Sequence, residues 1–151
     1  VYKLPDMIKR ILKNILVTLM WSFIAAFIIT PRIYLRIEYS LTHGGTEPYM
    51  LPILDWPQYV VLCFASFLMG FLIGNFAVFL VLYLLGVVLS CIIMYILICL
   101  PVYLNILTSE YFLYYGFSQA ALNYVAKTWI ITPFILFLFV GVFGVFSKEA
   151  I

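Results

Sequence analysis

The chain has very little charge for its length. Charged residues make up 9% of its 151 residues, against roughly 25% in an average soluble domain. Hydrophobic residues make up 67%. A soluble fold of this size leaves much of its surface in water and cannot hide so large an apolar fraction. The composition predicts a membrane protein, and a net charge of +2 leaves no basic patch for nucleic acid.

The residues that usually bind metals and cofactors are also scarce. His43 is the only histidine, so a bis-histidine haem cannot form within this chain. Cys63, Cys91 and Cys99 all lie in apolar runs, where a free cysteine packs as a small apolar residue. A bridge between Cys63 and Cys99 on neighbouring helices is the less favoured alternative. We expect no disulfide framework, no metal site and no cofactor.

Ionisable side chains are missing from the apolar segments. Carboxylates inside a membrane mark proton relays and ion paths, and residues 14–31 and 59–107 contain no Asp, Glu, Lys, Arg or His. The paired aspartates of lipoprotein signal peptidases and the membrane glutamate of small multidrug carriers are both absent. These absences argue against catalysis or proton-coupled transport within the spans.

The apolar segments predict an all-α membrane protein, a four-transmembrane-helix bundle that forms one domain over residues 1–151. A bilayer core of about 30 Å takes roughly 20 helical residues. The uncharged stretch 59–107 is too long for one span, and Gly74-Asn75 suits the turn between two, with Gly86 as the alternative. We expect a kink at Pro133. The expected spans are residues 11–30, 57–73, 76–104 and 121–146.

Basic residues predict how the bundle is oriented. The flanks of the two termini carry five of them and the opposite side carries three. Because positively charged flanks stay in the cytoplasm, we expect both termini there, in a multi-pass protein of the cell membrane. The five are Lys3, Lys9, Arg10, Lys13 and Lys148, and the three are Arg32, Arg36 and Lys127.

The segment 32–42 interleaves charged and apolar residues, and it opens a large extracytoplasmic loop that continues to Gln58. Its odd-numbered residues are apolar, which is typical of a half-buried strand, and 49–54 would be the partner in a short β-hairpin. A helix that continues the first span also fits, with Ile33 and Ile37 on one face. Both interpretations remain open at this point.

This loop holds the residues that we expect to contact a partner, and glycines in the spans are the expected helix-packing positions. Small residues let two membrane helices approach closely, and the candidates are Gly70, Gly74, Gly141 and Gly144. The candidate partner contacts are Arg32, Arg36, Glu38, Tyr39, His43, Glu47 and Asp55.

The function that these patterns favour is a non-catalytic integral membrane subunit, or an assembly or scaffold component, of a larger membrane protein complex. Its partners would be the lipid bilayer and other membrane subunits. The first alternative is an oligomeric channel or transporter for a small solute or ion, lined by backbone and hydroxyl groups. The less favoured one is a membrane-surface enzyme that uses His43, Glu47 or Asp55 as base and orienting group.

Overall fold

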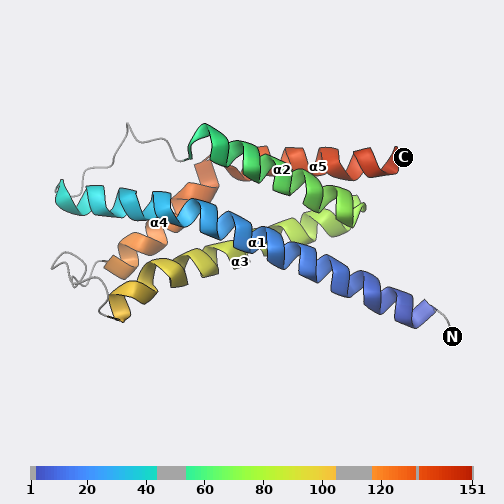
Figure 1. Ribbon diagram of the computed structural model, residues 1–151, viewed down its shortest axis with the longest axis horizontal. Helices are drawn as coiled ribbons and strands as arrows, with labels where there is room; N and C mark the ends of the chain where they lie inside the picture. Colours follow the sequence, from blue (N-terminus) through green and yellow to red (C-terminus); the bar gives the residue numbers. More distant parts are fainter. Residues whose placement is uncertain (1–2, 44–53, 105–116, 132, 151) are drawn as a thin grey trace.

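The computed structural model describes residues 3–43, 54–104, 117–131 and 133–150, and nearly all of these are helical. Most of the helices run along one axis, and the two ends of the chain lie at the same end of the molecule (Figure 1). Over the described ranges the protein is all-α. Its helices are α1 (Lys3–Thr42), α2 (Trp56–Ile73), α3 (Phe76–Tyr103), α4 (Phe117–Ile131) and α5 (Pro133–Glu149).

Three helices are long and apolar enough to cross a membrane, over Pro5–Ser40, Trp56–Ile73 and Phe76–Pro101. A fourth span exists if α4 and α5 count as one, since the pair is bent by 43° at the break before Pro133. Proline lacks the N–H that continues a helix and crowds the preceding turn, which accounts for the break. The prediction of several helices long and apolar enough to cross a membrane is confirmed, with three or four candidate spans among the described residues.

The expectation of a β-strand over 32–42 is wrong, because α1 continues through Pro31 to Thr42 as one helix. Leu35 and Tyr39, which a strand would bury beside Ile33 and Ile37, are 49% and 37% exposed. The burial therefore follows the helical repeat and not the strand repeat. No strand occurs in the parts of the chain that the structure describes, and most of the expected partner strand, residues 49–53, lies outside them.

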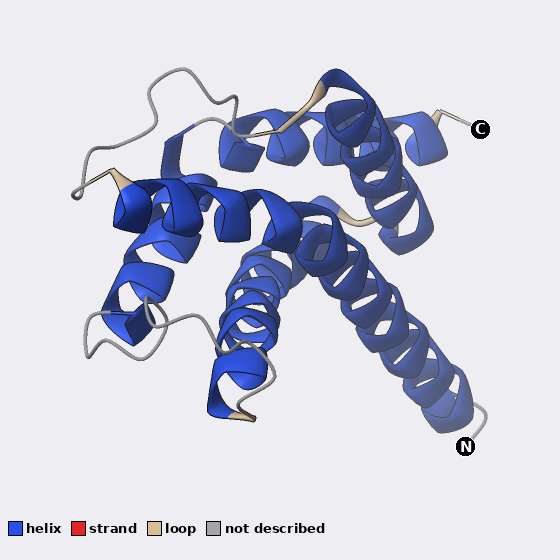
Figure 2. Ribbon diagram, turned by 60° about the vertical axis from the view of Figure 1, so that its left-hand side comes forward, coloured by secondary structure: helices blue, strands red, loops and turns tan. Residues whose placement is uncertain are grey.

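Tertiary packing explains why the helix prevails. Helix α4 packs against α1, and Figures 1 and 2 place it beside the C-terminal part of α1. Ile33 and Ile37 are buried, one helical turn apart. A sheet partner would have to satisfy the backbone of a strand here, whereas a helix satisfies its own backbone and still buries both isoleucines.

A tight turn joins α2 to α3. Gly74 has a φ of 59°, in the left-handed region that glycine adopts without a steric cost, and its N–H donates to the Gly70 carbonyl at 2.8 Å. The Asn75 side chain accepts a hydrogen bond from the Val78 N–H at 3.0 Å. Gly74 thus ends α2 and Asn75 caps α3, so the two helices run antiparallel with almost no loop.

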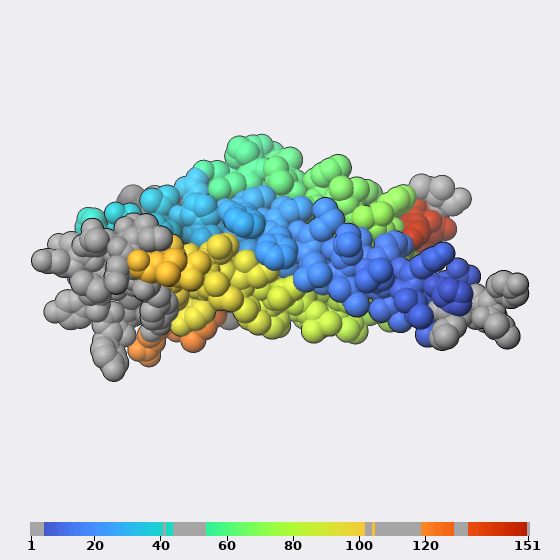
Figure 3. All heavy atoms as spheres, turned by 60° about the horizontal axis from the view of Figure 1, so that its bottom comes forward, coloured from blue at the N-terminus to red at the C-terminus, as the bar shows by residue number. Residues whose placement is uncertain are grey.

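The most extensive helix packing occurs in two pairs, α2 with α5 and α1 with α3. Figure 3 shows α1 crossing diagonally over α3, with α2 along its other side. The N-terminal part of α1 extends past the bundle (Figure 2), and every residue from 5 to 13 is exposed. The core therefore lies along the middle and C-terminal parts of α1.

Candidate functional site

One end of the α1–α2 pair is closed by an ion pair between Arg32 and Asp55. Asp55 is the N-cap residue of α2, and its backbone N–H donates to the Gln58 side chain at 2.9 Å. The two charged side chains are 24% and 44% exposed, so the pair sits at the rim of the packed bundle. We call this end, defined by Arg32 and Asp55, the Arg32 end.

Beyond Arg32, α1 continues for almost three turns and carries most of the other candidate partner contacts. The rings of Tyr39 and His43 stack with centroids 4.0 Å apart and planes 9° apart. Helical spacing places Arg36 on the same face as these two rings, and Glu38 on a different one. Arg36 is half-buried, and Glu38 and His43 are exposed. Glu47 lies outside the described residues.

The opposite end of the same helix pair is closed by two lysines. The ammonium groups of Lys13 in α1 and Lys148 in α5 donate to one acceptor, the Leu72 carbonyl oxygen, at 2.7 and 3.2 Å. Leu72 is in the last turn of α2, where carbonyls lack a helical donor and carry the negative end of the helix dipole. We call this end, defined by Lys13, Leu72 and Lys148, the Lys13 end.

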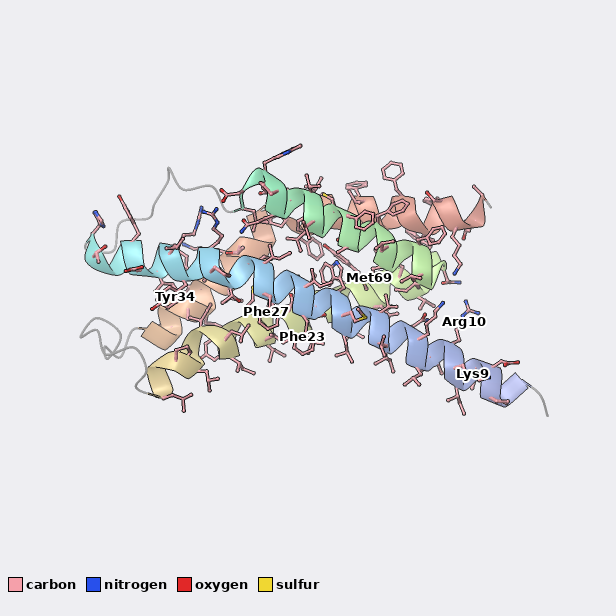
Figure 4. All side chains as sticks on the ribbon, in the orientation of Figure 1. Lys9, Arg10, Phe23, Phe27, Tyr34 and Met69 are labelled. Atoms are coloured by element: carbon pink, nitrogen blue, oxygen red, sulfur yellow. The ribbon has the colours of Figure 1, made fainter. Side chains whose placement is uncertain are left out.

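The two ends bracket a length that matches a membrane. At about 1.5 Å of rise per residue, the axis of α1 from Lys13 to Arg32 measures about 28 Å, close to the roughly 30 Å of a bilayer core. Within α1 this interval contains no charged residue. Lys9 and Arg10 lie farther along the extended N-terminal part of the helix (Figure 4). The interval between the two charged ends of α1 therefore matches the thickness of a bilayer core.

Three of the four candidate packing glycines lie where helices touch through their backbones. A methyl group at Gly70 of α2 would overlap the carbonyl oxygen of Gly141 in α5. One at Gly144 would overlap the carbonyl of Phe67, and one at Gly141 would meet the Phe79 ring of α3. Small residues permit such close approach between membrane helices. The structure brings Gly70, Gly141 and Gly144 together in one α2–α5 contact.

The fourth glycine, Gly74, has a different place. It is the left-handed cap of α2, and the aliphatic stem of Lys148 lies against it, in the space that a side chain would fill. Gly74 therefore makes room for the lysine that reaches the Leu72 carbonyl. It belongs to the Lys13 end and not to the α2–α5 glycine contact.

Polar side chains inside the bundle connect α1 to its neighbours. The Trp21 indole N–H donates to the Ser66 hydroxyl of α2 at 3.0 Å. The Ser22 hydroxyl lies 3.0 Å from the Gly86 carbonyl of α3 and 2.8 Å from the Thr18 carbonyl of its own helix, and it donates its single proton to one of the two at a time. A serine in a membrane helix can bond to its own helix backbone, so the sequence gives no sign that Ser66 has a partner on another helix. A tryptophan and a serine adjacent on α1, amid apolar residues, were the available signal for these contacts.

An aromatic cluster joins α3 to α1 and α5. The ring of Tyr83 lies 5.2 Å from Trp21, 5.8 Å from Phe79 and 5.5 Å from Phe134, between ring centroids. The Tyr83 hydroxyl donates to the Phe134 carbonyl at 2.7 Å, just after the α4–α5 break. A buried tyrosine needs such a partner for its hydroxyl. The Tyr83 hydroxyl therefore connects α3 to α5.

The described residues contain no cluster of metal ligands and no disulfide bond. No group of three or more His, Cys, Asp or Glu residues there is arranged to hold a metal ion. Cys63, Cys91 and Cys99 are all free, so the alternative bridge between Cys63 and Cys99 does not form.

Comparisons with protein-family models, with curated proteins and with solved structures return no match for this chain.

Proposed function

We propose that this chain is a non-catalytic integral membrane subunit, or an assembly component, of a larger membrane protein complex. The observation that carries the proposal is the C-terminal part of α1, which continues past the Arg32 end as a helix with charged and aromatic side chains. Glu38 and His43 are exposed there, and Tyr39 is stacked on His43. A rigid helix that presents such groups is a suitable docking element, because little ordering entropy is lost when it binds.

The interior of the bundle supports the same proposal. Among the buried hydroxyls that the structure describes, Ser22 and Ser66 bond between helices, and Thr18, Ser90 and Thr128 bond to carbonyls of their own helices. These groups stabilise the packing of the chain. A reaction centre would instead hold polar groups toward a cleft, ready for substrate.

The outward faces of the helices are suited to lipid or to other subunits. Along α3, five apolar side chains are at least half exposed: Val81, Leu84, Leu85, Val88 and Ile92. In a membrane such faces need no water-soluble cover, since lipid chains are as apolar as the side chains. They leave ample area for neighbouring membrane helices.

Site-specific photocrosslinking tests the proposal. A photoreactive residue at position 38 should crosslink to a second polypeptide in native membranes. The same residue at position 149, also exposed but at the other end of the chain, is the matched control and should not form that adduct. A monomer that purifies alone in mild detergent, without adducts from position 38, would count decisively against the subunit function.

We propose further that the bundle crosses the membrane four times with both termini in the cytoplasm. Lys13 and Lys148 meet at one carbonyl, which supports a common side for the two terminal flanks. That side carries the larger number of basic residues, as cytoplasmic flanks do. In a cysteine-free background, a cysteine at position 43 should react with an impermeant thiol reagent on intact cells. One at position 9 should react only after permeabilisation, and the reverse pattern would invert the topology.

A further inference from the structure

An open groove runs between α1 and α2 at the surface of the bundle. It has a volume of about 300 Å³ and is lined by side chains of these two helices alone, almost all of them apolar. Trp21 and Ala65 lie along it, and Met69 lies between the two helices (Figure 4). In a bilayer such a groove does not stay empty, because empty space forfeits dispersion contacts along its whole lining.

The groove reaches the Lys13 end. Leu72 lines it, and the carbonyl of that residue holds the ammonium groups of both Lys13 and Lys148. Because both bonds end on one oxygen, the two positive charges lie close together. Each ammonium has three N–H donors and spends one on Leu72, so two remain on each.

The two lysines at this end form no ion pair with a described residue, and the acidic residues near them on the same two helices, Asp6 and Glu149, are exposed. The ion pair of the described chain is Arg32–Asp55, at the opposite end, and neither Lys13 nor Lys148 has an acidic partner within the described ranges. Arg10 lies near enough to Lys13 to add to the positive potential. Two adjacent ammonium groups repel each other, and an anion between them removes that repulsion.

We propose that the Lys13 end binds the phosphate of an anionic phospholipid, with one acyl chain of the same lipid seated in the α1–α2 groove. The Lys13 and Lys148 ammonium groups would contact the phosphate from two helices, and Trp21 would lie beside the chain. The occupant follows from two observations together: the groove is open and apolar, and it ends beside two ammonium groups that share one carbonyl. A zwitterionic lipid fits the groove equally well but neutralises the lysine pair less.

Fluorescence quenching in reconstituted vesicles tests the proposal directly. The protein should carry W56F and W129F, so that Trp21 is the only tryptophan. Trp21 lies about 12 Å along α1 from Lys13, which matches bromine atoms at the middle of an acyl chain. In vesicles of unlabelled zwitterionic lipid, a small fraction of brominated anionic lipid should quench Trp21 with about tenfold higher apparent affinity than brominated zwitterionic lipid. Equal quenching by the two lipids would overturn the proposal.

Charge variants separate specific binding from general attraction to the surface. K13Q with K148Q should abolish the preference for anionic lipid. The matched control, R36Q with K127Q, removes the same charge from other positions and should retain it. Loss of preference in both double variants, or in neither, contradicts a site at the lysine pair. If a double variant fails to fold, the protein with both lysines unchanged still gives the comparison between anionic and zwitterionic lipid.

Two further measurements address the groove and the source of the phosphate. A65F should fill the α1–α2 groove and remove the quenching, whereas L85F, in the similar groove between α1 and α3, should leave it intact. Unchanged quenching in A65F would place the chain elsewhere. Inorganic phosphate at millimolar concentration should not displace the brominated lipid. Displacement would show that the lysine pair takes free phosphate, and would overturn the assignment to lipid.

Discussion

The contact between α2 and α5 differs in kind from the contacts that α1 makes with α2 and α3. In the first, Gly70, Gly141 and Gly144 let backbone touch backbone. In the second, side chains do the joining: Trp21 bonds to Ser66, and Ser22 to the Gly86 carbonyl. A backbone contact cannot adjust to an added methyl group, whereas a side chain can rotate. The two kinds of contact should therefore respond differently to substitution.

Glycine substitutions should produce the largest effect and the clearest contrast. Gly70→Ala and Gly144→Ala each drive a methyl group into the backbone of the partner helix, and should lower the free energy of unfolding by about 3 kcal/mol. Gly86→Ala is the comparison, because its methyl would lie 3.1 Å from a carbon of the Trp21 ring, which has to give by only a few tenths of an ångström. It should cost about 1 kcal/mol. Unfolding titrations in mixed micelles measure all three, and equal losses would contradict the distinction.

The Trp21–Ser66 bond should contribute less than the glycine contact. A double-mutant cycle with Trp21→Phe and Ser66→Ala should give a coupling of about 1 kcal/mol, within the range found for interhelical hydrogen bonds in membranes. The cycle cancels the part of each loss in unfolding free energy that comes only from the changed volume of the side chain. A coupling near zero would mean that shape alone joins α1 to α2.

Removal of the Ser22 hydroxyl should have a smaller effect. Ser22→Ala should destabilise the protein by about 0.6 kcal/mol, because interhelical bonds of this type are worth little when the separated helices find other partners. Ser147→Ala is the control, since that exposed hydroxyl bonds only to the Phe143 carbonyl of its own helix. The same unfolding titration should detect no change for the control.

The smallest effect is expected at the Arg32–Asp55 ion pair. Both side chains are partly exposed, and ion pairs of this kind contribute about 0.5 kcal/mol. Arg32→Gln should cost about that much at low salt and less at high salt, where exposed charges are screened. A loss that is large and independent of salt would mean that the pair is far better shielded than its exposure indicates.

The segment 32–42 illustrates a feature that sequence could not decide. Its apolar residues fit a strand and a helix about equally well, because Ile33 and Ile37 lie on the apolar face under either repeat. In the folded chain, where helices far along the sequence pack against α1, these two residues are buried and Leu35 is exposed. No local property of the segment contains that information.

Ser66 and Lys148 show the same limit at the candidate sites. A serine in a membrane helix can satisfy itself locally, so its bond to Trp21 depended on how α1 and α2 are aligned. Lys148 is a basic residue near the chain end, as in many helices, and its convergence with Lys13 on Leu72 arises only when α5 packs beside α2. In both cases the partner lies more than forty residues away.

The sequence alone determined the surroundings of the chain and its type of secondary structure. Its 67% of apolar residues, in long uncharged runs, require lipid around them. They also require helices, because in a membrane interior the backbone groups of a segment have to bond to one another. It also marked Gly74 as a turn, since few other residues adopt a positive φ. Only the tertiary structure decided which glycines touch, that α1 stays helical past Pro31, and that two distant lysines meet at one carbonyl. These features depend on how whole helices align with one another. Where nearly every residue of a helix is apolar, its sequence does not show which face meets which neighbour.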